Sequence, residues 1–237
     1  MFSHFFKWNE LRGIDFASLP IGSTEQHGHH LPIFTDSIIA NALAEGVARR
    51  FENSYLLPLV PFSSSYEHAG FPGSVSLKVT TILAVINDIL ESLEMSGIKK
   101  CVIVSGHQGN FFLHNFTQET NRYGPRMLQL PTKKAWEAAY ENAGISATIS
   151  RDMHAGEGET SLIKHIAPET IKESGIVDVD SPNRPLFEVH GIKQYSHTGV
   201  IGFPTRATAE KGKEILETLI GESEKLIKLF TEDNYNG

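Results

Sequence analysis

The segment CVIVSGHQGN, residues 101–110, contains the pattern that decides the fold of this chain. A short apolar run ends abruptly in a polar turn that carries Gly106 and Gly109, and a helical pattern follows. A buried strand that leads through such a turn into a helix is typical of an α/β sheet. Cys101, the only cysteine, stands in the apolar run, so we expect a buried thiol and no thiolate metal site or disulfide.

Similar apolar runs alternate with helical periodicity along the 237 residues. The pattern predicts strands at 16–21, 55–61, 100–105 and 127–130, and helices at 37–51, 78–95, 110–123 and 207–230, with a short helical run that ends near 166–168. Residues 178–199 are predicted to form a long irregular excursion over the surface. The alternation predicts one α/β domain, residues 1–237, with a largely parallel sheet.

The composition indicates which kinds of binding partner to expect. The net charge of −7 and the pI near 5.9 leave no basic stripe, so we expect no nucleic-acid partner and favour a small polar substrate. The first residues lack the apolar core of a signal peptide, and no stretch approaches the roughly 18 apolar residues of a membrane span. We therefore expect a cytoplasmic protein without a membrane partner.

The densest polar cluster, IGSTEQHGHHLPIFTD at residues 21–36, begins where the first predicted strand ends. On extended backbone Glu25 and His27 share one face while Gln26 points away, and Asp36 opens the following helix. Carboxylate and imidazole donors suit zinc, manganese or iron(II). The alternative, on residue types alone, is a solvated surface loop.

A second strand end favours the metal site over the loop. His107 follows the apolar run 101–105 just as Glu25 follows residues 16–21. A single histidine at a strand end is more often a hydrogen-bonded structural residue than a ligand, but ligands bind at the carboxyl ends of parallel strands. Two such turns in one sheet therefore favour a shared metal site.

Two further segments carry candidate functional residues. DMHAGEGETS, residues 152–161, places His154, Glu157 and Glu159 close together. These side chains can transfer protons or complete the ligand set of a metal. The structural alternative is that they only cap a helix. YEHAGFPGSVSL, residues 66–77, forms a rigid turn that holds candidate substrate contacts. The predicted substrate contacts are Glu67, His68, Ser74 and Gln108.

These motifs together resemble the creatininase (creatinine amidohydrolase) family. The resemblance rests on EQHGHHLPIFTD at 25–36, GHQGN at 106–110 and HAGEGETS at 154–161, with FPGS at 71–74 and GFPTRATAEKG at 202–212. It implies a three-layer α/β/α sandwich with a mostly parallel central sheet. It also implies a hydrolase that cleaves a carbon–nitrogen amide bond of a small substrate through a water bridging two divalent metals.

The resemblance also assigns roles to individual residues. It implies that Glu25 and His107 bind one metal, that His27 binds the other, and that Asp36 bridges the two. His154 matches the histidine that shuttles a proton to the leaving nitrogen, and Glu159 is the second catalytic candidate. The metals are expected to be zinc, with manganese or iron as alternatives, and the assembly a homo-oligomer, with a hexamer as the family expectation.

Two departures from creatininase shape the expectations. Gly109 stands where creatininase has a metal-binding glutamate, so Glu157 is expected to supply that carboxylate. The tryptophan-bearing stretch by which creatininase closes over its substrate is not evident before His154. The family also contains a deformylase of a formylamino-pyrimidine nucleotide and a peptidase of a cofactor-precursor peptide, so we expect an amide other than creatinine.

The sequence leaves two alternatives to a metallohydrolase function. The first is a non-catalytic member of the same fold that binds a metal or ligand, for which Gly109 is the only motivation. The second is a nucleotide-binding α/β protein with GHQGN as a phosphate turn. The second ranks lowest, because the chain lacks a GxGxxG fingerprint and a P-loop lysine.

Overall fold

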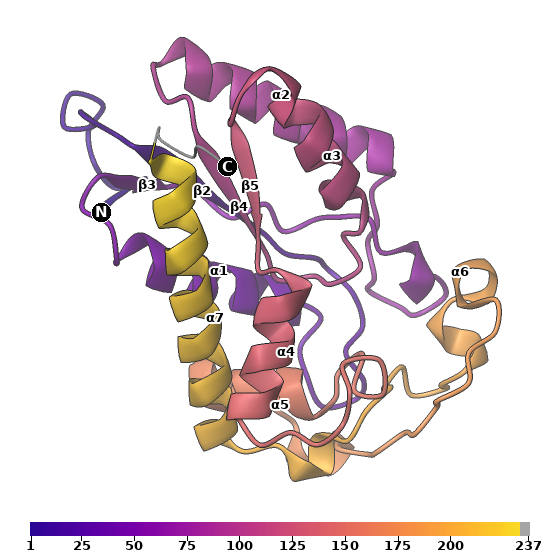
Figure 1. Cartoon of the computed structure of the whole chain (residues 1–237). Coiled ribbons are helices and arrows are strands. Elements are labelled where there is room, and N and C mark those ends of the chain that lie inside the picture. Colours follow the sequence, from indigo (N-terminus) through magenta and orange to yellow (C-terminus); the bar gives the residue numbers. More distant parts are fainter. Residues whose placement is uncertain (233–237) are drawn as a thin grey trace.

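A computed structural model describes residues 1–232 and contains a five-stranded sheet in which every paired strand is parallel (Figure 1). The strands lie in the order β1-β3-β2-β4-β5. Their bounds are β1 Phe2–Ser3, β2 Phe16–Ile21, β3 Ser54–Leu56, β4 Cys101–Ser105 and β5 Met127–Leu130. Parallel strands need helical crossovers, and helices cover both faces of this sheet.

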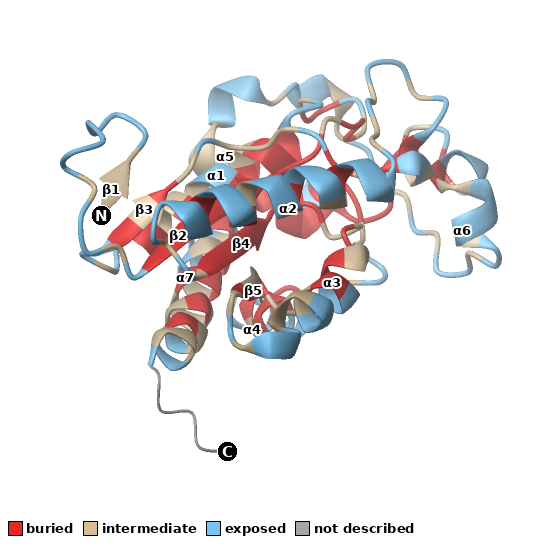
Figure 2. Cartoon of the chain, turned by 90° about the horizontal axis from the view of Figure 1, so that it is seen from above, coloured by how far each residue is buried: buried red, intermediate tan, exposed pale blue. Residues whose placement is uncertain are grey.

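The side chains of β4 alternate between two apolar cores. Val102 and Val104 pack with helices α1, α4, α5 and α7, whereas Cys101 and Ile103 pack with α2 and α3. The helices are α1 Thr35–Ala48, α2 Val79–Met95, α3 Phe112–Thr120, α4 Lys133–Asn142, α5 Glu157–Ile166, α6 Phe187–His190 and α7 Ala209–Thr231. Buried residues therefore cover both faces of the central sheet (Figure 2). This confirms the predicted three-layer α/β/α sandwich.

The predicted strands 16–21 and 127–130 match β2 and β5, and strand 100–105 begins one residue later, at Cys101. The predicted strand 55–61 is shorter because Pro58 has no N–H to donate to a ladder. The chain nevertheless stays beside β2, since Leu57 N donates to Ser18 O at 2.9 Å.

The four long predicted helices overlap α1, α2, α3 and α7, and the short run after residue 156 is α5. Helix α4 was missed, although its signals are ordinary. Thr132 caps it by accepting a hydrogen bond from Ala135 N at 3.2 Å, and Trp136 and Tyr140 form its buried face. The edge strand β1 was also missed, because two residues carry no alternation.

The ends of β2 and β4 lie side by side, because Ile21 is the register partner of Ser105. The polar turns that follow both strands therefore leave from one edge of the sheet. Helix α1 begins against the second of these turns. A Cβ on Gly106 would lie 2.0 Å from the backbone oxygen of Asp36, so the close approach of helix and turn requires glycine. Gly106 thus approaches the helix that carries Asp36.

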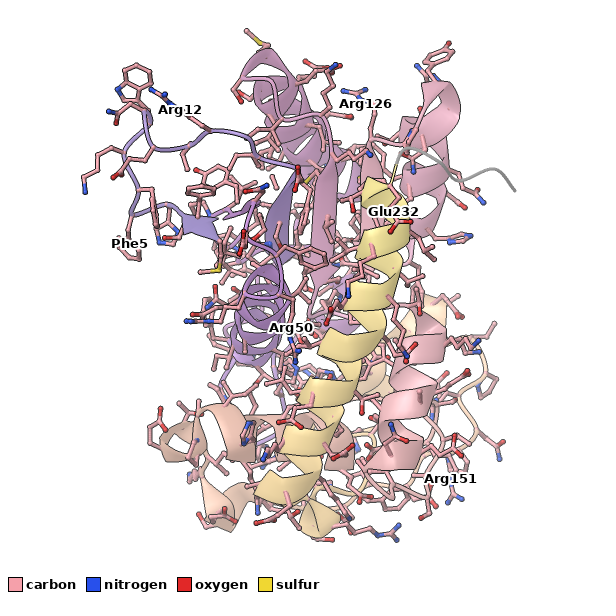
Figure 3. All side chains as sticks on the ribbon, turned by 60° about the vertical axis from the view of Figure 1, so that its left-hand side comes forward. Phe5, Arg12, Arg50, Arg126, Arg151 and Glu232 are labelled. Carbon is pink, nitrogen blue, oxygen red and sulfur yellow. The ribbon has the colours of Figure 1, made fainter. Side chains whose placement is uncertain are left out.

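The predicted irregular excursion, residues 178–199, contains only the one-turn helix α6 and the short 3-10 turn Ile192–Gln194 among its described elements. In Figure 1 this segment, drawn in orange, lies at the lower right, away from the sheet. At the opposite side an N-terminal loop carries Phe5 and Arg12 away from the sheet, and Arg50 lies beside α7 (Figure 3). Among the described residues, no helix is both long and apolar enough to cross a membrane.

The contact at Gly106 leads to a test of the fold. Gly106→Ala should lower the free energy of unfolding by about 1–3 kcal/mol, because the added methyl overpacks a backbone contact. Gly221→Ala is the matched control, since nothing lies within 4 Å of its Cβ in α7 and alanine should stabilise the helix by about 0.5–1 kcal/mol. Urea unfolding measures both, and equal effects would contradict the contact.

Candidate metal centre

Asp36 lies at the centre of the polar cluster and faces a different histidine with each oxygen. Its Oδ1 is 3.1 Å from Nε2 of His27, and its Oδ2 is 3.2 Å from Nδ1 of His107. All three side chains are buried, and Asp36 stands in the first turn of α1, where the helix dipole favours a carboxylate. One carboxylate therefore joins two imidazoles from two strand ends.

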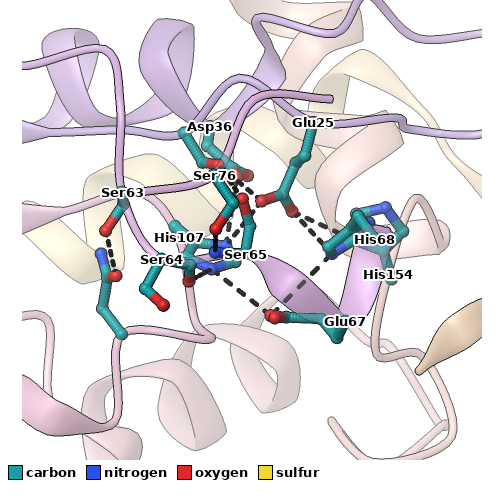
Figure 4. Close-up of polar contacts among 12 residues, drawn as sticks. Glu25, Asp36, Ser63, Ser64, Ser65, Glu67, His68, Ser76, His107 and His154 are labelled. Carbon is teal, nitrogen blue, oxygen red and sulfur yellow. Dashed lines mark hydrogen bonds and ion pairs between the residues drawn. The ribbon is translucent and has the colours of Figure 1, made fainter. Parts of the chain in front are cut away.

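Glu25 lies beside Asp36 and shares His107 with it (Figure 4). Its Oε2 is 3.3 Å from Nδ1 of His107 and accepts a hydrogen bond from Ser23 Oγ at 2.6 Å. Its Oε1 is 3.0 Å from Nε2 of His68, without the alignment of a hydrogen bond. The hairpin that returns the chain to α1 is closed by a hydrogen bond from Glu25 N to Ile33 O.

In their neutral forms, two histidines of the cluster turn a lone pair inward. Nδ1 of His27 lies 3.2 Å from the backbone oxygen of Glu25, and Nε2 of His107 lies 3.2 Å from that of Ser64. Because a carbonyl only accepts, these outer nitrogens carry the protons of the neutral rings. The inner nitrogens then face carboxylate oxygens, an arrangement typical of metal-binding histidines.

The carboxylates also fit a cation. Oε1 of Glu25 and Oδ2 of Asp36 are buried and accept no hydrogen bond among the described residues. Buried acceptors normally have partners, and uncompensated buried charge is costly. The donors form three overlapping groups whose atoms lie within 4.8 Å of one another. These groups are Glu25, His27 and Asp36; His27, His154 and Glu159; and Glu25, His68 and His154.

The pKa shifts of the cluster histidines follow from these contacts. Burial alone lowers the pKa of His27, but the carboxylates of Asp36, Glu159 and Glu25 together outweigh it and raise the pKa to about 9. Burial is likewise outweighed at His107, where Glu25 and Asp36 raise the pKa well above its ordinary value. At His154 burial dominates and, with His27 and His68 nearby, lowers the pKa. The carboxylates of the cluster therefore favour the protonated forms of His27 and His107.

Glu157, which was expected to bind the second metal, is in none of these three groups of donors. Nζ of Lys211 donates to its carboxylate at 2.5 Å. Glu159, two residues along α5, has its Oε2 3.7 Å from Nε2 of His27 and accepts a hydrogen bond from Ala155 N at 2.6 Å. Glu159 is therefore the carboxylate of α5 that joins the cluster.

The 3-10 turn Tyr66–His68 brings Glu67 to the rim of the cluster. Oε1 of Glu67 is 3.5 Å from Nε2 of His107 and would be 2.4 Å from a Cβ on Gly109. Ser74 accepts a hydrogen bond from Gln26 N at 3.0 Å, and Gln108 is half-buried beside His107. The four predicted substrate contacts therefore differ in exposure: His68 is buried in the cluster, and the other three are partly exposed.

Asp152 was not singled out from the sequence, although it organises the segment around His154. It is buried and accepts hydrogen bonds from the backbone nitrogens of Glu157, Gly158 and Phe203. Asp152 lies five residues before the start of α5, whose N-cap is Gly156, so its position is not that of an ordinary capping residue. Its bond to Phe203, 51 residues away, could not be predicted from spacing.

The placement of the two α5 carboxylates gives a direct test. Glu159→Gln should lower the zinc content of the dialysed protein, because it removes a charged donor next to His27. Glu157→Gln is the matched control and should retain the wild-type content, because its partner is Lys211. Elemental analysis measures both, with thermal unfolding as a check of folding. Loss of metal from the Glu157 variant alone would contradict the assignment.

Metal binding should depend on pH in a defined direction. Because the pKa of His27 is raised to about 9, the ring is protonated at pH 7 and must lose that proton to bind a metal. The apparent zinc affinity should therefore rise by up to about tenfold per pH unit for each proton released, and level off above about pH 9. Calorimetric titrations at pH 7 in buffers of different ionisation enthalpy count the released protons. Binding without proton release would contradict the prediction.

Comparison with known proteins shows similarity along nearly the whole chain. The mycofactocin precursor peptide peptidase of Mycolicibacterium smegmatis is 30% identical over 231 residues, which cover 93% of this chain and 87% of the relative. The 3-dehydro-scyllo-inosose hydrolase of Thermotoga maritima is 27% identical, over 94% and 79% of the two chains. A solved structure described as manganese creatininase shares the fold, with a TM-score of 0.82, 22% identity and coverage of 96% and 97%.

The creatininase family profile, described as creatinine amidohydrolase, matches residues 5–227. The matched region includes every residue of the buried cluster and both strand ends that carry it. The family profile and the shared fold therefore both cover the part of the chain that carries the cluster. This protein belongs to the creatininase family of hydrolases.

Proposed function

We propose that the chain is a binuclear metal-dependent amidohydrolase that cleaves a carbon–nitrogen amide bond, in a peptide or another small substrate. One observation carries the proposal: the two oxygens of Asp36 face the inner nitrogens of two different histidines, His27 and His107. A carboxylate in this position suits a bridge between two cations. The relative that is a precursor-peptide peptidase supports amide-type substrates.

The donor set divides into two halves around Asp36. Glu25 and His107 would hold one cation, and His27 and Glu159 the other. When bound, the two cations would acidify a water molecule and polarise the carbonyl of the substrate. Mixed oxygen and nitrogen donors suit zinc, with manganese or iron(II) as alternatives, and the similar solved structure is described with manganese.

His154 is the proposed proton carrier. Burial and the neighbouring histidines lower its pKa, so the ring is neutral at pH 7 and can accept a proton at the nucleophile before it donates one to the leaving nitrogen. Its Nδ1 lies 3.9 Å from Oε1 of Glu25, which puts the accepting atom at the cluster. A neutral base beside two buried carboxylates suits a reaction that moves a proton from water to an amine.

Three rim residues are proposed to contact the substrate. Glu67, Ser74 and Gln108 border the cluster and are partly exposed. Glu67 is near the two imidazoles of His68 and His107, at 4.0 and 3.5 Å. A rim with one carboxylate and two neutral polar side chains suits a polar amide substrate, such as a short peptide or a formamide.

The experiment separates metal binding from proton transfer. Protein purified without chelator and loaded with zinc, manganese or iron(II) is screened for amine release from creatinine, formamides and short peptides. Asp36→Ala should lose both metals and all turnover, whereas His154→Ala should keep its metals and lose about 10²–10⁴-fold in kcat. Asp88→Ala, a change at an exposed position of α2, is the matched control.

Two results would contradict the proposal. Full metal content in the Asp36 variant would remove the bridging role. Equal turnover by wild type and the His154 variant would remove the proton carrier. A fully loaded protein that hydrolyses no amide of the panel but binds one of them would instead favour a non-catalytic binding protein.

A further inference from the structure

Gln26 stands between two residues of the cluster, Glu25 and His27, but its side chain lies behind them. It is buried, with 6% of its surface exposed. Its backbone N–H donates to Ser74 Oγ at 3.0 Å, and its amide lies against the glycine that ends the long excursion. A Cβ on Gly199 would lie 1.8 Å from Oε1 of Gln26, so that approach requires glycine.

The orientation of the Gln26 amide is fixed by its partners. Oε1 accepts from the backbone N–H of Gly28 at 2.9 Å, and Nε2 donates to the backbone oxygen of Gly199 at 3.2 Å. A flipped amide would oppose donor to donor and acceptor to acceptor. The atom of Gln26 that faces His68 is therefore a donor.

This donor sets the tautomer of His68. Nε2 of Gln26 is 3.0 Å from Nδ1 of His68, so Nδ1 must accept, and the proton of the neutral ring is on Nε2. That atom lies 3.0 Å from Oε1 of Glu25. His68 thus presents an N–H to the cluster.

The backbone of the same residue sets the tautomer of His154. Nε2 of His154 lies 2.6 Å from the backbone oxygen of Gln26 and must donate to it, which leaves the lone pair on Nδ1. Nδ1 faces the cluster, 3.9 Å from Oε1 of Glu25. The ring centroids of His68 and His154 lie 4.4 Å apart. The N–H nitrogen of His68 and the lone-pair nitrogen of His154 therefore both lie near one oxygen, Oε1 of Glu25, at 3.0 and 3.9 Å.

We propose that Gln26 is a positioning residue that fixes two histidines in opposite tautomers, His68 as a donor through its side chain and His154 as an acceptor through its backbone. A secondary amide offers the complementary pair, a C=O that accepts and an N–H that donates. The catalytic consequence rests on the proposed amidohydrolase function. The tautomers follow from the hydrogen bonds alone.

The test reads the tautomers directly by ¹⁵N NMR of zinc-loaded protein labelled at histidine, with signals assigned from His68→Gln and His154→Gln. In the wild type His68 should carry its proton on Nε2, and Nδ1 of His154 should be unprotonated. Gln26→Met removes the side-chain donor and keeps the backbone carbonyl. His68 should then populate both tautomers while His154 keeps its signals.

Further variants sharpen the test. Gln26→Glu offers only acceptors and should move the His68 proton to Nδ1, whereas Gln194→Met, at an exposed glutamine, should change neither ring. A wild-type His68 protonated on Nδ1, or unchanged His68 signals in Gln26→Met, would overturn the proposal. Equal disturbance of both histidines would reduce Gln26 to a general structural role.

The NMR result separates this proposal from the proposed function. Should the protein hydrolyse no amide, the tautomers remain measurable and the positioning role is judged on them alone. Where an amide substrate is found, Gln26→Met should reduce kcat more than it changes KM, because the ring orientations alter proton transfer. Opposite tautomers in a protein without amidase activity would retain the positioning inference and reject the function.

Discussion

Two carboxylates share one imidazole in the interior of this protein, and the rest of the site is organised around that contact. Glu25 and Asp36 both approach Nδ1 of His107, at 3.3 and 3.2 Å, and both are almost completely buried. Two negative charges so close in a low-dielectric interior repel each other unless positive charge lies between them. The raised pKa values of His27 and His107 favour protonated rings, which supply that positive charge, and a metal cation would replace those protons.

The strand ends of this site could be predicted from the sequence, because apolar runs that stop at Gly-rich polar turns mark both of them. Glu25, His27, Asp36 and His107 follow from that pattern and lie together in the structure. The choice between Glu157 and Glu159 could not be made in this way. Residues two apart on a helix point in widely different directions, and the start of α5 depends on Asp152 and on a lysine 54 residues further along.

The strand after residue 53 was predicted too long although Pro58, which has no N–H to donate to a ladder, stands inside the apolar run. Contacts between distant segments set a different limit. The tautomers of His68 and His154 depend on contacts between segments 42 and 128 residues apart. Local pattern therefore predicts which segments meet at the sheet edge, and tertiary contact decides which atom of each side chain faces inward.

The excursion at residues 178–199 contacts the surroundings of the cluster through two glycines. A Cβ on Gly191 would lie 2.6 Å from the backbone oxygen of Glu67, and Gly199 presses against the amide of Gln26. Before the first of these glycines, the excursion carries exposed residues such as Leu186 and Val189. Substitutions at those exposed positions leave the two glycine contacts in place, whereas a side chain at Gly191 or Gly199 would collide with Glu67 or with Gln26.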